Sequence, residues 1–355
     1  MQYTWINNVK ISSDYTIITF HDIFNQKIEP NTLPENLTTL IFGLDFNQEI
    51  ESNSLPENLT SLTFGYNFNQ KIEPNTLPEN LTTLIFGDWF NQKIEPNILP
   101  ENLTNLIFGV RFNQKIEPNT LPENLTTLTF GYAFDQEIEP NTLPKKLTNL
   151  TFGYYFNQKI ELNTLPENLT TLIFGDWFNQ KIEPNTLPKN LTTLNFGLDF
   201  NQKIEPNTLP ENLTTLTFGC CFDQKIDSII PSNLISLTFG RGFNQEIESE
   251  MLPSNLKNIN FNWIYLCKND PIENYIEMVT NIPNYYHVEI FLEKDIFGRH
   301  GPKWPIHVIK YEEHKWISNI YKIQGKYAHP IHDSITILIN KETYQPYSSA
   351  KSALK

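Results

Sequence analysis

The amino-acid sequence predicts a repeat solenoid that is mainly β, and two observations support this fold class. The first is a 22-residue consensus, F-N-Q-K-I-E-P-N-T-L-P-E-N-L-T-T-L-x-F-G-x-x, which recurs eleven times from Phe24 onward, with one residue lost in the copy that begins at Phe222. A fixed short period indicates one structural coil per copy, each stacked on the next. The second is that each copy holds six large apolar positions. One coil cannot offset its own ordering entropy with so little burial, so several coils must stack.

The strand of each coil is expected in its second half. In the first copy this is residues 37–42, with Leu40 and Phe42 on one face and Ile41 on the other. Gly43 follows the strand and indicates a tight bend. The predicted core positions of this copy are Phe24, Ile28, Leu33, Leu37, Leu40 and Phe42.

The first half of each coil is expected to hold a second, brief strand and a return stretch. Residues 25–28 are too short for a helix and are predicted to form that strand. Two prolines within residues 30–34 exclude a regular helix from the return stretch.

Both ends of the array are predicted to be capped. Residues 14–20 align with the strand half of a copy, so residues 1–23 are expected to form a half-coil cap before the repeats of residues 24–262. Residues 263–355 have another composition and are predicted to form a small α+β module that covers the last coil. Its expected elements are a helix over residues 270–280 and strands over residues 287–291, 306–311 and 334–340.

The repeated motif F-N-Q-x-I, followed by P-N-x-L-P-x-N-L-T-x-L-x-F-G, resembles the FNIP (IP22) repeat, a relative of leucine-rich repeats. The resemblance covers residues 13–262 and implies a leucine-rich-repeat-like solenoid. It brings no catalytic motif. Some members of this family carry an F-box, which would imply a substrate receptor of a ubiquitin ligase. Only 23 residues precede Phe24, about half of what an F-box needs, so that role is not carried over.

The net charge of −14 is concentrated in the repeats. Residues 24–262 hold 14 basic and 28 acidic side chains, whereas residues 263–355 hold 11 and 10. This charge favours a basic protein partner over nucleic acid or an anionic membrane. One acidic column consists of Glu29, Glu51, Glu73, Glu95, Glu117, Glu139, Glu161, Glu183, Glu205, Asp227 and Glu248. Two residues earlier lies a mostly Lys column, expected to neutralise it, of Lys27, Lys71, Lys93, Lys115, Lys159, Lys181, Lys203 and Lys225.

Composition points to an intracellular, cytoplasmic protein. Three cysteines form no disulfide framework, there is no apolar run of membrane-spanning length, and the first 15 residues do not resemble a signal peptide. Asn-Leu-Thr recurs at eight positions from Asn36 to Asn212 and matches the glycosylation sequon. These asparagines are interpreted as structural, with amides that stack or bond turn backbone.

The most variable column of the repeats is the candidate binding site. The two residues after each repeat glycine change almost freely, as expected at an exposed corner, although a tolerant turn without function would also vary. Aromatic residues and Arg are common interface anchors. The candidate partner-binding residues are Asp45, Tyr66, Asp88, Trp89, Arg111, Tyr132, Tyr154, Tyr155, Asp176, Trp177, Asp199 and Arg241.

The sequence contains other candidate sites. The outward strand face, with its columns of Thr and Ile such as Thr83 and Ile85, could bind protein or be an ordinary exposed sheet. Six histidines lie in residues 287–332, but none has recognised metal-ligand spacing, and Cys220-Cys221 is a weak redox candidate. No catalytic, cofactor or metal site is predicted.

The sequence therefore predicts a non-enzymatic protein–protein interaction scaffold. Three alternatives stay open at this point: a self-associating structural protein, a ubiquitin-ligase substrate-recognition subunit without its own F-box, and a metal-dependent hydrolase in the C-terminal module.

Overall fold

The structure is a computed structural model. It describes residues 3–6, 9–240, 242, 243, 245, 247, 251–262, 287–294, 300–311, 315–322 and 333–339. The chain divides into two compact units, Met1–Leu191 and Thr192–Lys355, and each is described by itself. The described residues contain no α-helix, and the helix predicted at residues 270–280 lies outside them.

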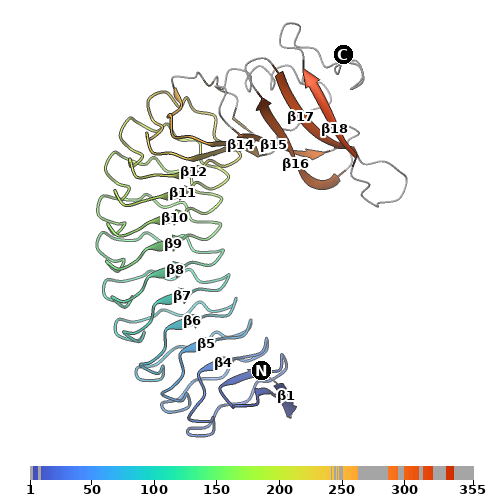
Figure 1. The fold of residues 1–355 in the computed structure, drawn as a ribbon. Coiled ribbons are helices and arrows are strands. Elements are labelled where there is room, and N and C mark those ends of the chain that lie inside the picture. The colour runs from blue at the N-terminus through green and yellow to red at the C-terminus, as the bar shows by residue number, and fades with distance from the viewer. Residues whose placement is uncertain are drawn as a thin grey trace. The chain divides into compact units, whose positions relative to one another are not determined.

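The first unit is a stack of coils joined by one parallel ladder (Figure 1). Each strand pairs with its counterpart one repeat later, so that Leu40 lies opposite Leu62, which lies opposite Leu84. Its parallel strands are β3 (Ile17–Phe20), β4 (Thr39–Ile41), β5 (Ser61–Thr63), β6 (Thr83–Ile85), β7 (Asn105–Ile107), β8 (Thr127–Thr129), β9 (Asn149–Thr151) and β10 (Thr171–Ile173). The predicted β-solenoid of 22-residue coils is confirmed.

An antiparallel hairpin precedes the first coil. Strands β1 (Tyr3–Ile6) and β2 (Val9–Ser12) pair antiparallel, and β2 pairs antiparallel with β3. The predicted alignment of residues 14–20 with the strand half of a repeat is confirmed, because Ile18 lies opposite Leu40. In the β2–β3 turn, Ser12 Oγ donates a 2.6 Å hydrogen bond to Asp14 Oδ1. This bond and those from Thr16 lower the pKa of Asp14 to about 2.

The second unit continues the same pattern and then departs from it. Strands β11 (Thr193–Asn195), β12 (Thr215–Thr217), β13 (Ser236–Phe239) and β14 (Asn258–Asn262) pair in parallel. Strand β15 (His287–Lys294) pairs parallel with β14, and β16 (His300–Tyr311), β17 (Lys315–Lys322) and β18 (Asp333–Ile339) follow antiparallel. The three predicted strands of this region are confirmed, and β17 was not predicted. The predicted domain boundaries stay predictions.

Three tight turns bend the first coil. The N–H groups of Thr32, Leu37 and Phe46 donate to the carbonyls three residues earlier, at 3.3, 3.1 and 3.3 Å. Asn31 has φ of 60° and follows Pro30, which are the features of a type II turn. Asn tolerates this left-handed conformation, which explains an Asn at this place in nine copies, from Asn31 to Asn207.

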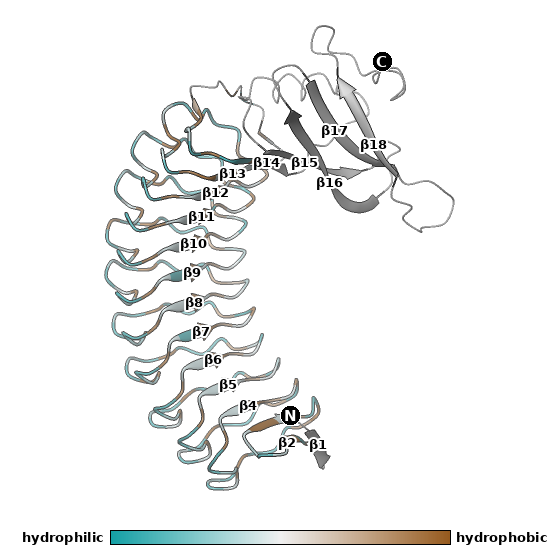
Figure 2. Cartoon of the chain, viewed as in Figure 1, coloured by the Kyte–Doolittle hydropathy of each residue, from teal (hydrophilic) through white to brown (hydrophobic). Residues whose placement is uncertain are grey.

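Two columns of Phe rings fill the core. Phe42 stacks on Phe46 at 3.7 Å between ring centroids, and each stacks on its counterpart in the next coil, Phe64 at 5.8 Å and Phe68 at 6.1 Å. The predicted core is confirmed, with Leu40 fully buried, although Phe24 and Leu33 of the first copy are half-buried. Figure 2 shows the same alternation of hydrophobic and hydrophilic segments in successive coils.

The second strand predicted at residues 25–28 is wrong. These residues form no strand, because side chains replace the backbone ladder. Asn25 Oδ1 accepts hydrogen bonds from Asn47 N–H and from Gln48 Nε2 of the next coil, both at 2.9 Å. The pattern repeats with an Asp acceptor where Asp135 Oδ1 binds the N–H of Asn157.

The sequon asparagines are structural, as predicted. Asn58 Nδ2 donates to the carbonyl of Glu35 at 2.9 Å, and Asn80 Nδ2 donates to that of Glu57 at 2.9 Å. Each amide thus binds turn backbone of the preceding coil.

The repeat glycine is required by close approach between coils. A Cβ built on Gly131 would lie well inside van der Waals contact of the Gly109 carbonyl oxygen, and the same holds along the column. From Gly43 to Gly175, and at Gly219 and Gly240, the repeat glycines do not have positive φ, so the absence of a side chain, rather than backbone freedom, selects Gly. The bend predicted after Gly43 is confirmed by the bond from Phe46 N–H to its carbonyl.

Replacing Gly131 with Ala is expected to destabilise the array by at least about 2 kcal/mol, because the Gly109–Val110 backbone of the preceding coil must move away from the new methyl. The urea midpoint of unfolding measures this. Val110→Ala, at a position 42% exposed, is the control and should change stability by less than about 0.5 kcal/mol. Equal midpoints for the two variants would contradict the close-approach explanation.

Replacing Thr120 with Val is expected to stabilise the protein by about 1 kcal/mol, because Thr120 Oγ1 is buried without a hydrogen-bond partner. Ile98 already occupies the same position one coil earlier. The matched control is Ser54→Ala, which removes a 2.8 Å hydrogen bond to the Ile28 carbonyl and should destabilise by a similar amount. A lower thermal midpoint for Thr120→Val would refute this account.

Candidate functional site

The candidate site is the corner stripe, defined as the two residues that follow each repeat glycine. Backbone bonds hold it. Phe156 N–H donates to the Gly153 carbonyl at 3.1 Å, which closes the turn. Tyr155 N–H donates to the Tyr132 carbonyl of the preceding coil at 3.0 Å, and the same bond recurs at other coils. Because these bonds use only backbone atoms, the side chains of the corner stripe can differ from coil to coil, which agrees with the variable sequence of this column.

A first aromatic group in the stripe already holds a cation. Trp89 meets Tyr66 edge-on, with 6.4 Å between ring centroids. Arg111 places its guanidinium carbon 3.5 Å from the Trp89 ring centroid. This is a cation–π contact between successive coils. Tyr66, Trp89 and Arg111 are called the Trp89 cluster.

A second aromatic group is larger and consists of Tyr132, Tyr154, Tyr155 and Trp177, called the aromatic quartet. Tyr132 and Tyr154 stack at 4.4 Å with 8° between ring planes. Tyr155 meets Tyr132 edge-on at 4.8 Å and Trp177 edge-on at 4.4 Å. Partial desolvation is the main cause that raises the pKa of Tyr132, and the interaction with the neighbouring Tyr155 is the second. Three coils therefore contribute to one neutral aromatic surface.

The quartet is accessible to a partner. Tyr132 and Trp177 are 44% and 48% exposed, and Tyr154 and Tyr155 are half-buried. The ring contacts hold these side chains in defined orientations, so binding would immobilise few rotamers. Such rigid, partly buried aromatic residues are typical anchors of interfaces.

The remaining predicted residues are more dispersed. Asp45 is exposed and accepts a 3.0 Å hydrogen bond from Asn67 Nδ2. Asp88 and Asp176 are half-buried, and Asp199, in the second unit, is exposed and 3.8 Å from Cys221 Sγ. Arg241 lies outside the described residues. The structure thus brings seven of the predicted residues into the two aromatic groups.

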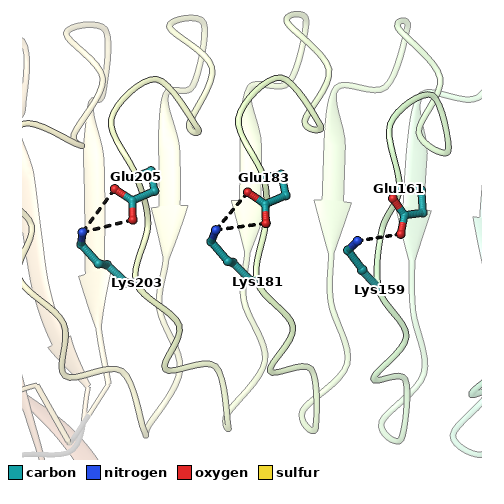
Figure 3. A network of polar contacts seen from close by, with 6 residues as sticks. All are labelled: Lys159, Glu161, Lys181, Glu183, Lys203 and Glu205. Carbon is teal, nitrogen blue, oxygen red and sulfur yellow. Dashed lines mark hydrogen bonds and ion pairs between the residues drawn. The ribbon is translucent and has the colours of Figure 1, made fainter.

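The predicted neutralisation of the acidic column is confirmed. Lys159, Lys181 and Lys203 each pair with the Glu two residues later, at 2.8, 3.0 and 3.1 Å (Figure 3). Where the next coil has Glu in place of Lys, the Lys of the preceding coil pairs with the column Glu of that next coil. Lys115 lies 2.7 Å from Glu139, and this hydrogen bond raises the pKa of Lys115. The column is a compensated surface.

The strand face is the other surface predicted to bind. Its outward side chains, such as Thr83, Ile85 and Thr127, are half-buried and form an even polar and aliphatic face. No aromatic residue lies in these columns within β4–β12. The face therefore lacks the anchors that the corner stripe has.

The described residues contain no group of three or more His, Cys, Asp or Glu side chains placed to hold a metal ion. Neither Cys220 nor Cys221 forms a disulfide within the described part of the chain. His314, His329 and His332 lie outside the described residues. Within the described part of the chain, no helix is long and apolar enough to cross a membrane.

Parallel one-repeat register, buried Leu and Phe columns and a short strand per coil define a leucine-rich-repeat-like solenoid protein. The sequence matches the FNIP Repeat family in overlapping copies that together span residues 11–263. The chain belongs to this family of repeat proteins, as its motif predicted. Repeat solenoids of this kind serve as interaction or structural scaffolds.

Comparison with solved structures gives the same fold. The crystal structure of CroV588, described as a novel circular LRR protein structure, is 48% identical and has a TM-score of 0.69. The match covers 77% of this chain and 39% of the length of CroV588. The pneumococcal vaccine antigen PcpA matches over 83% of this chain and 99% of its own, at 14% identity, with a TM-score of 0.25, too low to indicate a shared fold. No curated protein matches the chain.

Sequence reasoning found the corner column but not its two aromatic groups. The signal was present, because stacked coils place residues 22 apart side by side, as Trp89 and Arg111 are. Tyr132 and Tyr154 have the same separation.

Trp89 and Arg111 are expected to be coupled by about 0.5–1 kcal/mol, because the guanidinium lies over the indole face. A double-mutant cycle of Trp89→Ala and Arg111→Ala, followed by urea unfolding, measures this coupling. Trp177→Ala with Arg111→Ala is the control pair and should be additive. Additivity of the first pair would show that the contact contributes nothing.

Proposed function

We propose that this protein is a non-enzymatic scaffold that binds a protein partner through the corner stripe, with the aromatic quartet as its centre. The observation that carries the proposal is the quartet itself. Four aromatic side chains from three coils meet on a surface, and two of them are more than 40% exposed. The solenoid does not need these rings, since equivalent places hold Asp45, Arg111 or Ala133 in other coils.

Repetition supports an interaction role over catalysis. Near-identical coils offer the same groups many times, whereas a catalytic centre needs a few different groups at one place. The corner stripe is the column in which coils differ most, so it can distinguish one partner from another. The expected intracellular location stays a prediction of the sequence.

The corner stripe is preferred to the strand face because of its residues. Trp, Tyr and Arg carry most of the binding energy at protein interfaces. The stripe has all three, and the described strand face has Thr, Ile and Asn.

Affinity purification from the native host tests the proposal with two matched triple variants. Trp89→Ala, Tyr154→Ala and Trp177→Ala together should remove specific partners, because each truncation removes an exposed or half-buried ring. The expected loss is at least about tenfold in recovered partner, from about 1–2 kcal/mol at one or two anchors.

The control replaces Thr83, Thr127 and Thr171 with Ala on the strand face. It should recover the same partners as the wild type. Loss of partners in this variant, with retention in the corner variant, would move the binding site to the strand face. Thermal unfolding of both variants checks that the solenoid is intact.

A further inference from the structure

The two aromatic groups of the corner stripe differ in one respect. The Trp89 cluster is covered by Arg111, at 3.5 Å from its indole centroid. Among the described residues, no Lys or Arg side chain lies over a ring of the aromatic quartet, although the quartet has more rings. The same column thus contains one aromatic group with a cation and one without.

Trp89 and Trp177 form a natural matched pair. Each lies within an identical 17-residue stretch, residues 81–97 and 169–185, so the two indoles have the same sequence on both sides. They are 39% and 48% exposed. The residue one repeat later is Arg111 for Trp89 but Asp199 for Trp177. The chain therefore supplies its own guanidinium to Trp89, whereas the equivalent sequence position for Trp177 holds an acidic residue.

The surroundings favour a positive ligand. The repeats of residues 24–262 carry a net charge of −14, the sum of 14 basic and 28 acidic side chains. Most described Lys residues of the ladder are paired with Glu, so their charge is locally compensated. A surface with this balance attracts cations at long range. Aromatic faces then select a guanidinium, which is planar and weakly hydrated, over an ammonium.

We propose that the aromatic quartet binds an arginine side chain of a protein partner, stacked as Arg111 stacks on Trp89. This inference rests on the proposed function and adds the chemistry of the partner. The partner segment is basic and arginine-bearing. The arginine lies over the exposed Trp177 indole and the adjacent tyrosine rings, and the net negative charge of the repeats attracts it at long range.

The test uses the full chain and a labelled peptide of alternating Arg and Gly, with binding measured by fluorescence anisotropy. A second peptide has citrulline in place of Arg, which keeps the planar shape and removes the charge. The wild-type protein should bind the Arg peptide at least about fivefold more tightly than the citrulline peptide. Equal affinities, or no binding of the Arg peptide, would overturn the proposal.

Variants locate the site. Trp177→Ala should weaken binding of the Arg peptide about 5- to 10-fold, whereas Thr127→Ala, on the strand face, should leave it unchanged. Trp177→Phe keeps an aromatic face and should give an intermediate affinity, which provides a test if the Ala variant does not fold. Equal binding to wild type and Trp177→Ala would mean that the peptide binds the acidic surface without the quartet, and the proposal would be wrong.

The outcome separates this inference from the proposed function. If the corner variant loses its native partner but the Arg peptide neither binds the quartet nor competes with that partner, the scaffold role stands and the arginine ligand is excluded. If the corner variant keeps its native partner, the proposed function fails as well.

Discussion

The structure depends on the close approach of successive coils at the glycine column. There the carbonyl of one glycine occupies the space that a side chain of the next would need, as at Gly109 and Gly131. This approach allows the corner backbone of one coil to bond to the coil before it, as Trp177 N–H does to the Tyr154 carbonyl at 2.9 Å. It also sets the repeat distance over which the Phe rings stack. Every other column is constrained by the same spacing, so one repeated interaction organises the array.

Columns of polar side chains complete the contacts that backbone alone does not make. Asn side chains at two positions of most coils bond the neighbouring coil, as Asn25 and Asn58 do. The ladder of Lys and Glu keeps stacked like charges compensated, and Lys115 reaches Glu139 because the coil of Glu139 has Glu137 in place of Lys. These columns explain why most positions barely change between copies. Each residue must be compatible with its own counterpart above and below.

The corner stripe is the exception, and this exception is the basis of the proposed function. Its structural bonds are made by backbone, so its side chains are released from the stacking requirement. Variation in the stripe produced two aromatic groups. The Trp89 cluster has the Arg111 guanidinium over its indole, whereas no Lys or Arg of the described residues lies over a ring of the aromatic quartet. A surface that differs from coil to coil on a uniform scaffold can carry specificity at little cost in stability. The membership in the FNIP repeat family and the similarity to CroV588 show the scaffold, and the corner residues distinguish this chain.

The period, the buried columns, the strand of each coil and the charge ladder could all be predicted from the amino-acid sequence. These features are local to one repeat or relate one repeat to the next, so a single copy such as residues 24–45 contains nearly all of them. The competition of polar side chains with backbone for hydrogen bonds became evident in the folded coils. Asn25 Oδ1 takes the N–H of Asn47, so residues 25–28 form no strand although their pattern allowed one. The contacts between the corner rings also could not be predicted, because ring orientation depends on packing against neighbouring coils and does not follow a periodic pattern. Strand β17 follows from antiparallel pairing after the repeats end, where no period remains to predict it.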